Sequence, residues 1–377
     1  MKRRDLGRGP RLRAGALTIA AALVCSSCEG RPLADGPRLG SLGAGQLVEI
    51  DLTSGLPERG QQTFFGPVPG TSHADLVLAL REIDPKGVKG VFVRLGSARF
   101  ALATASEVGD LLALMRDHDV PVTCHANELN NGSMLLAAKG CSSIWLSPGG
   151  SVDTIGLAFQ LLFAKSLLEK LEVSVDFLQV GKYKGAQEPY TRDEPSPEAR
   201  ETMESTLKAL RSAWASGIAL GRKKPELDAL LEDAPHPATT AKDLGLIDHV
   251  GFLDEAKTAA KELAKADDTE VVFGAKKGQS GGGMSEILRV LAGSDPGADP
   301  HVALVRASGA ITMGGGGGLL GGGDGITEQA LGKTVRKLRE DDAVKAVVLR
   351  IDSPGGSALA SDLLWHELML LREKKPL

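Results

Sequence analysis

Two stretches of this chain repeat each other at an offset of about 256 residues. Residues 88–95 read VKGVFVRL and residues 344–351 read VKAVVLRI. Each copy follows a segment with apolar residues at helical spacing and, further upstream, an apolar run at residues 47–52 or 302–307. Continuous apolar strands that alternate with helices are typical of a parallel sheet covered by helices. The repeat therefore predicts an α/β fold with two similar halves.

The two copies differ in how far they extend. The first continues through a strand over residues 120–124, a helix over 133–139 and a strand over 143–146. The second reaches only residues 375–377, which align with 119–121 at the start of that third strand. We therefore expect an incomplete second repeat with an unpaired sheet edge and uncovered apolar helix faces. A longer natural chain or another subunit would complete it.

Composition narrows the range of partners. Hydrophobic residues make up 42% of the chain and charged residues 24%, which is typical of a folded, soluble body. Residues 1–27 contain six basic side chains and one acidic one, so the remainder has 38 basic and 47 acidic side chains. An acidic body with only 4% aromatic residues is a poor candidate for binding nucleic acid. We expect no nucleic-acid partner.

The N-terminus has the pattern of an export signal. A basic segment precedes an apolar run over residues 14–24, which is too short to span a bilayer but suits a signal peptide. Ser26-Ser27-Cys28 resembles a bacterial lipobox, with lipid attachment at Cys28, although an ordinary cleaved signal or an uncleaved anchor also fits. Residues 29–45 are typical of a tether. These features predict an exported protein, anchored on the periplasmic side of a bacterial membrane.

Two cysteines, Cys124 and Cys141, lie in the predicted folded body. An exported location permits a disulfide between them, but two small buried thiols fit their apolar surroundings at least as well. The seven histidines are scattered along the chain, and no spacing of cysteine and histidine resembles a zinc site. The sequence therefore predicts neither a metal nor a cofactor.

The segment that most suggests chemistry is GKYKGAQEPY at residues 181–190. It follows a strand-like run over residues 173–180 and precedes a helix start at Ser196-Pro197, where the serine would cap the helix. This position suits the delivery of the Lys184 amine into a cleft. A lysine with the ordinary pKa near 10.4 is protonated at neutral pH, so a general base needs a lowered pKa. We therefore expect a dry environment around Lys184.

Four charged neighbours bear on that requirement. Lys182 and Arg192 would repel a second positive charge, whereas Glu188 and Asp193 would cancel this repulsion. The sequence alone does not rank the two effects.

These features resemble the signal peptide peptidase (protease IV) family of Ser/Lys peptidases, in its long form with two similar halves. The resemblance rests on residues 181–190, on IWLSP at 144–148 and on residues 341–361, and it covers residues 46–377. It implies Clp/crotonase-like repeats, with Lys184 as the general base. It also implies a membrane-associated serine peptidase, free of metal and cofactor, that cleaves hydrophobic peptides such as released signal peptides and forms a homo-oligomer.

In that family the nucleophilic serine lies in a Ser-Gly-Gly segment of the second half, which would follow Leu377. The resemblance therefore implies that the nucleophile is not present in this sequence. It also implies that Gly355 and Gly356, which follow an apolar strand, line the cleft and offer backbone N–H groups to an oxyanion. Relatives with a single repeat carry both residues in that repeat, and Ser133 precedes Lys184 by 51 residues. Ser133 is therefore a weaker substitute for the nucleophile.

The predicted division of the chain has five parts. They are a signal peptide with lipobox (1–28), a tether (29–45), a first peptidase-like repeat with a helical extension (46–270), a linker (271–300) and a truncated second peptidase-like repeat (301–377). Two functional hypotheses follow. The chain belongs to a Ser/Lys peptidase, or it is a catalytically inactive, lipid-anchored pseudo-peptidase that binds peptides or partner subunits.

Overall fold

The computed structural model describes residues 46–59, 62–63, 66–67, 72–83, 85–274, 299–314 and 325–377. The predictions on the signal peptide, on Cys28 and on the tether lie outside these residues, as does nearly all of the predicted linker. Among the helices of this described part, none combines the length and the apolar character needed to cross a bilayer.

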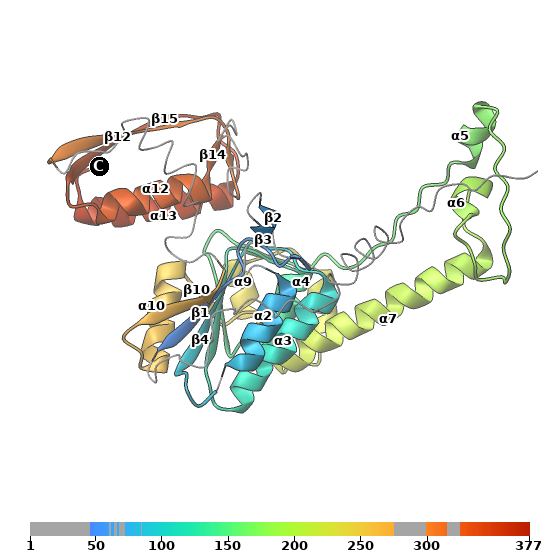
Figure 1. Ribbon diagram of the computed structural model, residues 1–377, viewed down its shortest axis with the longest axis horizontal. Helices are drawn as coiled ribbons and strands as arrows, with labels where there is room; N and C mark the ends of the chain where they lie inside the picture. The colour runs from blue at the N-terminus through green and yellow to red at the C-terminus, as the bar shows by residue number, and fades with distance from the viewer. Residues whose placement is uncertain are drawn as a thin grey trace, which may run out of the picture. The chain divides into compact units, whose positions relative to one another are not determined.

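A six-stranded parallel sheet organises the first half of the chain (Figure 1). Its strands are β1 (Leu47–Asp51), β4 (Gly90–Gly96), β5 (Val122–Ala126), β7 (Ser143–Leu146), β10 (His249–Val250) and β11 (Thr269–Phe273). Their order in the sheet is β10-β7-β5-β4-β1-β11, and all neighbours are parallel. The predicted α/β class is confirmed. The strand expected from residue 120 begins two residues later, at Val122.

Helices cover both faces of this sheet. Side chains of a strand alternate between the two faces, so each face presents apolar residues that a helix can cover. The more apolar face packs against α2 (His73–Glu82), α3 (Leu102–Asp117) and α4 (Asn131–Gly140). The other face packs against α10 (Leu253–Ala264), whose Ala256, Ala260 and Ala264 lie against Leu47 and Phe92. The small alanine side chains allow this helix to approach the strands closely.

Short elements complete the first half. β2 (Gln62–Thr63) and β3 (Gly66–Pro67) pair antiparallel, and β6 (Leu129–Asn130), β8 (Ser151–Asp153) and β9 (His236–Pro237) form a small second sheet. α8 (Leu227–Glu232) and α9 (Ala238–Asp243) precede β10 along the chain.

The second half has the predicted order of strand, helix, strand and helix. β12 (His301–Ser308) pairs in parallel with β15 (Val344–Asp352), α12 (Glu328–Glu340) and α13 (Ala358–Lys374) follow the two strands, and β13 (Ile311–Thr312) pairs with β14 (Ile326–Thr327). The amide of Val91 donates to the carbonyl of Pro121 at 2.9 Å, and the amide of Val347 donates to that of Pro376 at 2.9 Å. The last residues therefore occupy the position at which β5 begins in the first half.

An arm, which we define as residues 155–213, extends the first half (Figure 1). It contains α5 (Lys165–Lys170), α6 (Glu188–Thr191) and the first part of α7 (Pro197–Arg222). α7 has 26 residues and is therefore about 39 Å long. Its buried residues, Trp214, Ala215 and Ile218, all lie in its C-terminal half. Only that half packs on the core.

The prediction of a strand over residues 173–180 is wrong. The run is irregular and all its residues are exposed. Its apolar and β-branched residues favour an extended chain, but no other strand of the described residues pairs with it. An unpaired run cannot satisfy its backbone in a ladder, so it stays outside the regular structure.

Candidate active site

Lys184 lies in a turn of the arm, between the irregular run and α6. Gly181 begins this turn at φ +97°, and its carbonyl accepts a hydrogen bond from the Lys184 amide at 3.3 Å. The Lys184 side chain is exposed. The dry environment that a neutral lysine requires is therefore not supplied by the described residues of a single chain. Another surface would have to exclude water from this amine.

Glu188 fastens this turn to the start of α7. The carboxylate is buried, with 6% of the residue exposed, and it accepts hydrogen bonds from the Ser196 hydroxyl at 2.5 Å and the Ser196 amide at 2.7 Å. Burial acts to raise the pKa of the Glu188 carboxyl, but these two hydrogen bonds and the charge of Arg192 outweigh it and hold the pKa below its ordinary value. Glu188 is therefore ionised at neutral pH.

Asp193, which follows α6, also accepts hydrogen bonds from a serine. Its carboxylate accepts hydrogen bonds from the Ser166 hydroxyl at 2.5 Å and the Ser166 amide at 3.3 Å, and Lys165 lies 3.8 Å away. The hydroxyl hydrogen bond from Ser166 is the main cause of a lowered Asp193 pKa, and the charge of Lys165 contributes. Sequence reasoning singled out both acids and predicted Ser196 as a helix cap, but it did not predict that either acid would bind a serine.

Ser133 is a structural residue of α4. It is fully buried, and its hydroxyl oxygen accepts a hydrogen bond from the Asn130 amide at 2.8 Å. The Asn130 side chain accepts in return from the Ser133 amide at 3.2 Å, which completes a capping box. At the neighbouring Gly132, a Cβ atom would lie only 2.1 Å from the Phe100 carbonyl oxygen. Position 132 of this helix start therefore has no room for a side chain.

Ser133 and Lys184 are held at opposite ends of a long stretch of α7. The Trp214 indole N–H donates to the carbonyl of Asn131 at 2.9 Å, beside Ser133, whereas the Lys184 turn is fastened to Ser196. Eighteen residues of helix separate Ser196 from Trp214, which corresponds to about 27 Å. The structure therefore does not bring these two candidate residues together.

Gly355 and Gly356 form the turn between β15 and α13. They have φ values of +103° and +156°, which favour glycine. A Cβ atom at Gly356 would lie 2.0 Å from the Ile311 carbonyl oxygen, so close backbone approach explains this glycine. The Gly355 amide donates to the Ser353 hydroxyl at 3.1 Å, and Ser357 caps α13 as a helix-start serine should. The oxyanion role of the two glycines stays a prediction.

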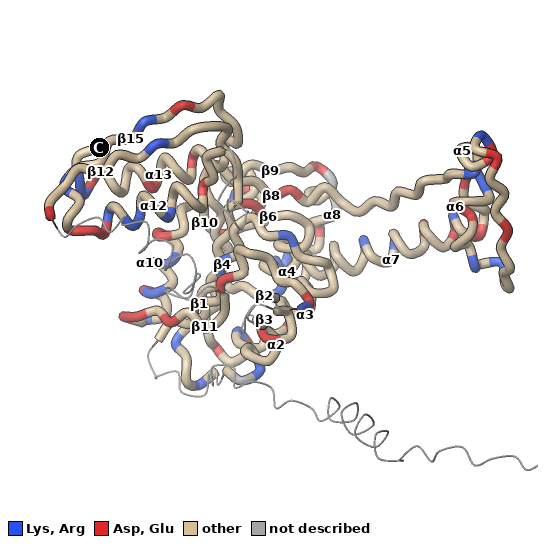
Figure 2. Tube along the Cα trace, turned by 45° about the horizontal axis from the view of Figure 1, so that its top comes forward, with Lys and Arg blue, Asp and Glu red and all other residues tan. Residues whose placement is uncertain are grey.

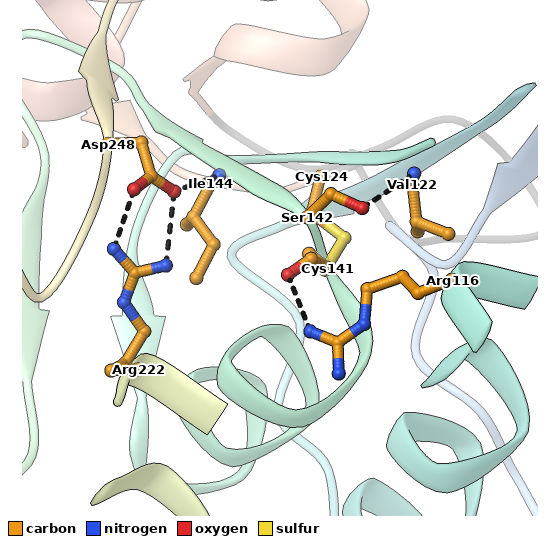
Figure 3. The surroundings of a disulfide bond; sticks show 8 residues. All are labelled: Arg116, Val122, Cys124, Cys141, Ser142, Ile144, Arg222 and Asp248. Atoms are coloured by element: carbon orange, nitrogen blue, oxygen red, sulfur yellow. Dashed lines mark hydrogen bonds and ion pairs between the residues drawn. A yellow bond between two sulfur atoms is a disulfide. The ribbon is translucent and has the colours of Figure 1, made fainter. Parts of the chain in front are cut away.

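Cys124 and Cys141 form a disulfide, a pairing that the sequence left open (Figure 3). It joins β5 to the end of α4, with Cα atoms 5.9 Å apart and both residues buried. In the same region Arg222, near the end of α7, pairs with Asp248 at 2.7 Å, and Asp248 also accepts from the Ile144 amide at 2.8 Å (Figure 3). These contacts fix the core end of α7 against β7.

His125, next to this disulfide, is a buried titratable group. It is 1% exposed, its Nε2–H donates to the Gly251 carbonyl at 3.2 Å, and the Ser147 hydroxyl oxygen lies 3.4 Å from Nε2. Burial lowers the pKa of His125 to about 4, although the Gly251 hydrogen bond opposes this shift. The sequence places His125 next to Cys124, but it did not indicate that the histidine side chain is buried. No metal-binding group of histidine, cysteine and acidic side chains occurs in the described part of the chain.

This burial makes the stability of the fold depend on pH. Between pH 6.5 and about 4 the unfolded chain binds a proton at His125 that the folded chain does not bind. Stability therefore falls as pH drops through this window, and we expect His125 to account for a loss of about 2 kcal/mol at pH 5. Urea unfolding at pH 7.5 and pH 5 would measure it.

The His125→Gln variant should lose this part of the pH dependence, because glutamine does not titrate. His118→Gln is the control, since His118 is exposed. An equal pH dependence in the wild type and in His125→Gln would contradict the assignment.

The comparisons with known proteins agree with the parallel α/β sheet, whose helices on both faces define a Clp/crotonase-like fold. A sequence profile of peptidase family S49 matches residues 115–267, which include the Lys184 turn. Over the matched residues the chain is therefore similar to this family of serine peptidases.

Three relatives illustrate the extent of the similarity. The chain is 32% identical over 238 residues to "Serine protease SPPA, chloroplastic" of Arabidopsis thaliana, which covers 63% of this chain and 34% of the relative. It is 31% identical over 310 residues to "Protease 4" of Salmonella typhi and 28% identical over 304 residues to that of Haemophilus influenzae, covering 79% and 78% of this chain. It spans 48% of each Protease 4 relative, so about half of their length.

Proposed function

We propose that this chain carries the general base of a membrane-associated Ser/Lys peptidase, with Lys184 as that base. The observation that carries the proposal is the Lys184 turn itself. It lies within the segment matched by the S49 profile, and the two nearest acids that follow it in sequence, Glu188 and Asp193, are hydrogen-bonded to Ser196 and Ser166. Among the described ion pairs, none involves Lys184. An amine without a bound carboxylate loses its proton more easily.

The nucleophilic serine comes from outside the first half. Two features support this: Ser133 is a buried capping residue, and about 27 Å of α7 separates its neighbour Asn131 from the Lys184 turn. The Gly355 and Gly356 turn would line the cleft that receives this serine.

The protein acts as a homo-oligomer in this proposal. Large apolar side chains on the arm are exposed beyond what a soluble monomer usually shows, with the strongest exposure at Ile155, Leu162, Leu171, Leu178, Val180 and Tyr183. Acidic and basic residues are mixed around α5 and α6 (Figure 2), which suits a protein partner better than an anionic lipid surface. A second copy that covers the arm would also exclude water from Lys184.

The substrates are hydrophobic peptides, such as released signal peptides, and the chain is exported and held at the membrane through Cys28. The buried disulfide between Cys124 and Cys141 supports an oxidising compartment such as the periplasm.

A second function rests on the same helix start. Because Gly132 has no room for a side chain and Ser133 is buried, the first half has no free hydroxyl where single-repeat relatives would carry one. This favours a pseudo-peptidase that binds peptides or partner subunits without cleaving them.

A chimera separates the two functions. The full chain is fused to the part of Salmonella typhi Protease 4 that follows the matched region. We expect the folded chimera to react with a fluorophosphonate and to cleave a hydrophobic fluorogenic peptide, while the full chain alone does neither. A folded chimera that is inert in both assays would favour the pseudo-peptidase. Labelling of the full chain at Ser133, lost in Lys184→Ala, would instead establish a dyad within one repeat.

A further inference from the structure

Glu188 and Asp193 follow Lys184 closely enough in sequence to pair with its amine. A carboxylate that contacts a lysine stabilises the ammonium form and so opposes its action as a base. The local structure determines whether these acids help or hinder the proposed chemistry. Both acids accept hydrogen bonds from serines. Glu188 is the more firmly held of the two, because it is buried and both of its carboxylate oxygens accept hydrogen bonds.

The backbone around Lys184 is shaped to keep Glu188 in this position. The Glu188 amide donates to the Gly185 carbonyl at 3.0 Å, and a Cβ atom at Gly185 would lie 3.2 Å from the Glu188 Oε1 atom. Glycine at this position lets the Lys184 turn lie directly against the carboxylate. Ser196 also accepts from the Ala199 amide at 3.1 Å, so the same hydroxyl caps α7 and holds Glu188.

We propose that Glu188 and Ser196 form a positioning pair for Lys184, which fixes the turn on the end of α7 and keeps the Glu188 charge away from the Lys184 amine. This inference rests on the proposed role of Lys184 as a base. Ser196 supplies two hydrogens to the carboxylate, so the charge of Glu188 is already compensated. Neither residue takes part in proton transfer.

Other charged side chains also lie near the turn. A cavity of about 500 Å³ lies beside Glu188 and Ser196 and is also lined by Asp176, Lys182, Arg192 and Glu198. Tyr183 donates its hydroxyl to Glu201 at 3.1 Å, which draws this second acid toward the tyrosine. Replacing Ser196 by alanine would therefore remove the hydroxyl hydrogen bond to Glu188 and leave only that of the backbone amide, which frees one carboxylate oxygen beside the Lys184 turn.

The test measures the reactivity of the Lys184 amine in the full chain, without any need for a nucleophile. An acetylating N-hydroxysuccinimide ester is added at pH 8, and peptide mass spectrometry gives the acetylation rate of Lys184 relative to that of Lys182. In Ser196→Ala we expect Lys184 to react about three- to tenfold more slowly, because the Glu188 carboxylate, then held by the backbone amide alone, can pair with the amine and favour its protonated form. In the Ser196→Ala/Glu188→Gln double variant we expect the wild-type rate to return.

The recovery distinguishes this role from a purely structural one, because loss of both partners cannot repair a merely loosened turn. Glu194→Gln, at an exposed acid of the same segment, is the matched control and should leave the rate unchanged. A wild-type rate in Ser196→Ala, or a double variant as slow as Ser196→Ala, would overturn the inference. An inactive chimera would refute the peptidase proposal without affecting this measurement.

Discussion

Replacement of Lys184 by alanine in the chimera is expected to lower kcat for a hydrophobic peptide by about 10³-fold with little change in KM. The reason is that the amine accepts the serine proton in the transition state and contributes little to binding the peptide. Steady-state kinetics with a fluorogenic peptide would measure both constants. The rate of fluorophosphonate labelling should fall in parallel, because this reaction needs the same activated hydroxyl.

Lys182→Ala is the matched control, since Lys182 belongs to the same exposed turn. It should keep activity within about threefold of the parent, because a surface charge two residues from the base acts only through a screened field. Equal losses in the two variants would mean that the arm needs positive charge in general, and the assignment of Lys184 as base would then fail.

Regular structure that depends on short stretches of sequence was predictable. The continuous apolar run in β4 and its counterpart in β15 indicated the parallel sheet, and the predicted helix cap Ser196 accepts the expected backbone amide. The strand over residues 173–180 failed because β-propensity reflects packing on a sheet, and this run has no sheet beside it.

The contacts that define the candidate site depend on how distant segments meet. Glu188 reaches Ser196 only because α6 and the turn after it fold the chain back over eight residues, and no local pattern fixes that path. The exposure of the Lys184 side chain was equally unpredictable from the sequence, which suggested a dry cleft, whereas the turn of the single chain is open to solvent. Pairing of Cys124 with Cys141 required the end of α4 to return to β5.

That disulfide gives the second large expected effect, on stability. Cys124 and Cys141 are 17 residues apart in sequence, and closing a loop of this size restricts the unfolded chain by about 3 kcal/mol in the chain-entropy description. The loop contains the end of β5 and the whole of α4, so its release affects the central strands of the sheet. We expect the Cys124→Ala/Cys141→Ala variant to be about 3 kcal/mol less stable than the wild type in urea unfolding.

Reduction separates the effect of the cross-link from the effect of the lost sulfur atoms. Under denaturing conditions with dithiothreitol the wild type should lose most of this difference, whereas the double alanine variant should not respond to the reductant. Both residues are buried, so a part of the loss in the variant reflects small cavities and persists under reduction. A wild type whose unfolding midpoint is the same with and without reductant would show that the cross-link does not restrain the unfolded chain. The fold of the first half would then rest on its packed sheet alone.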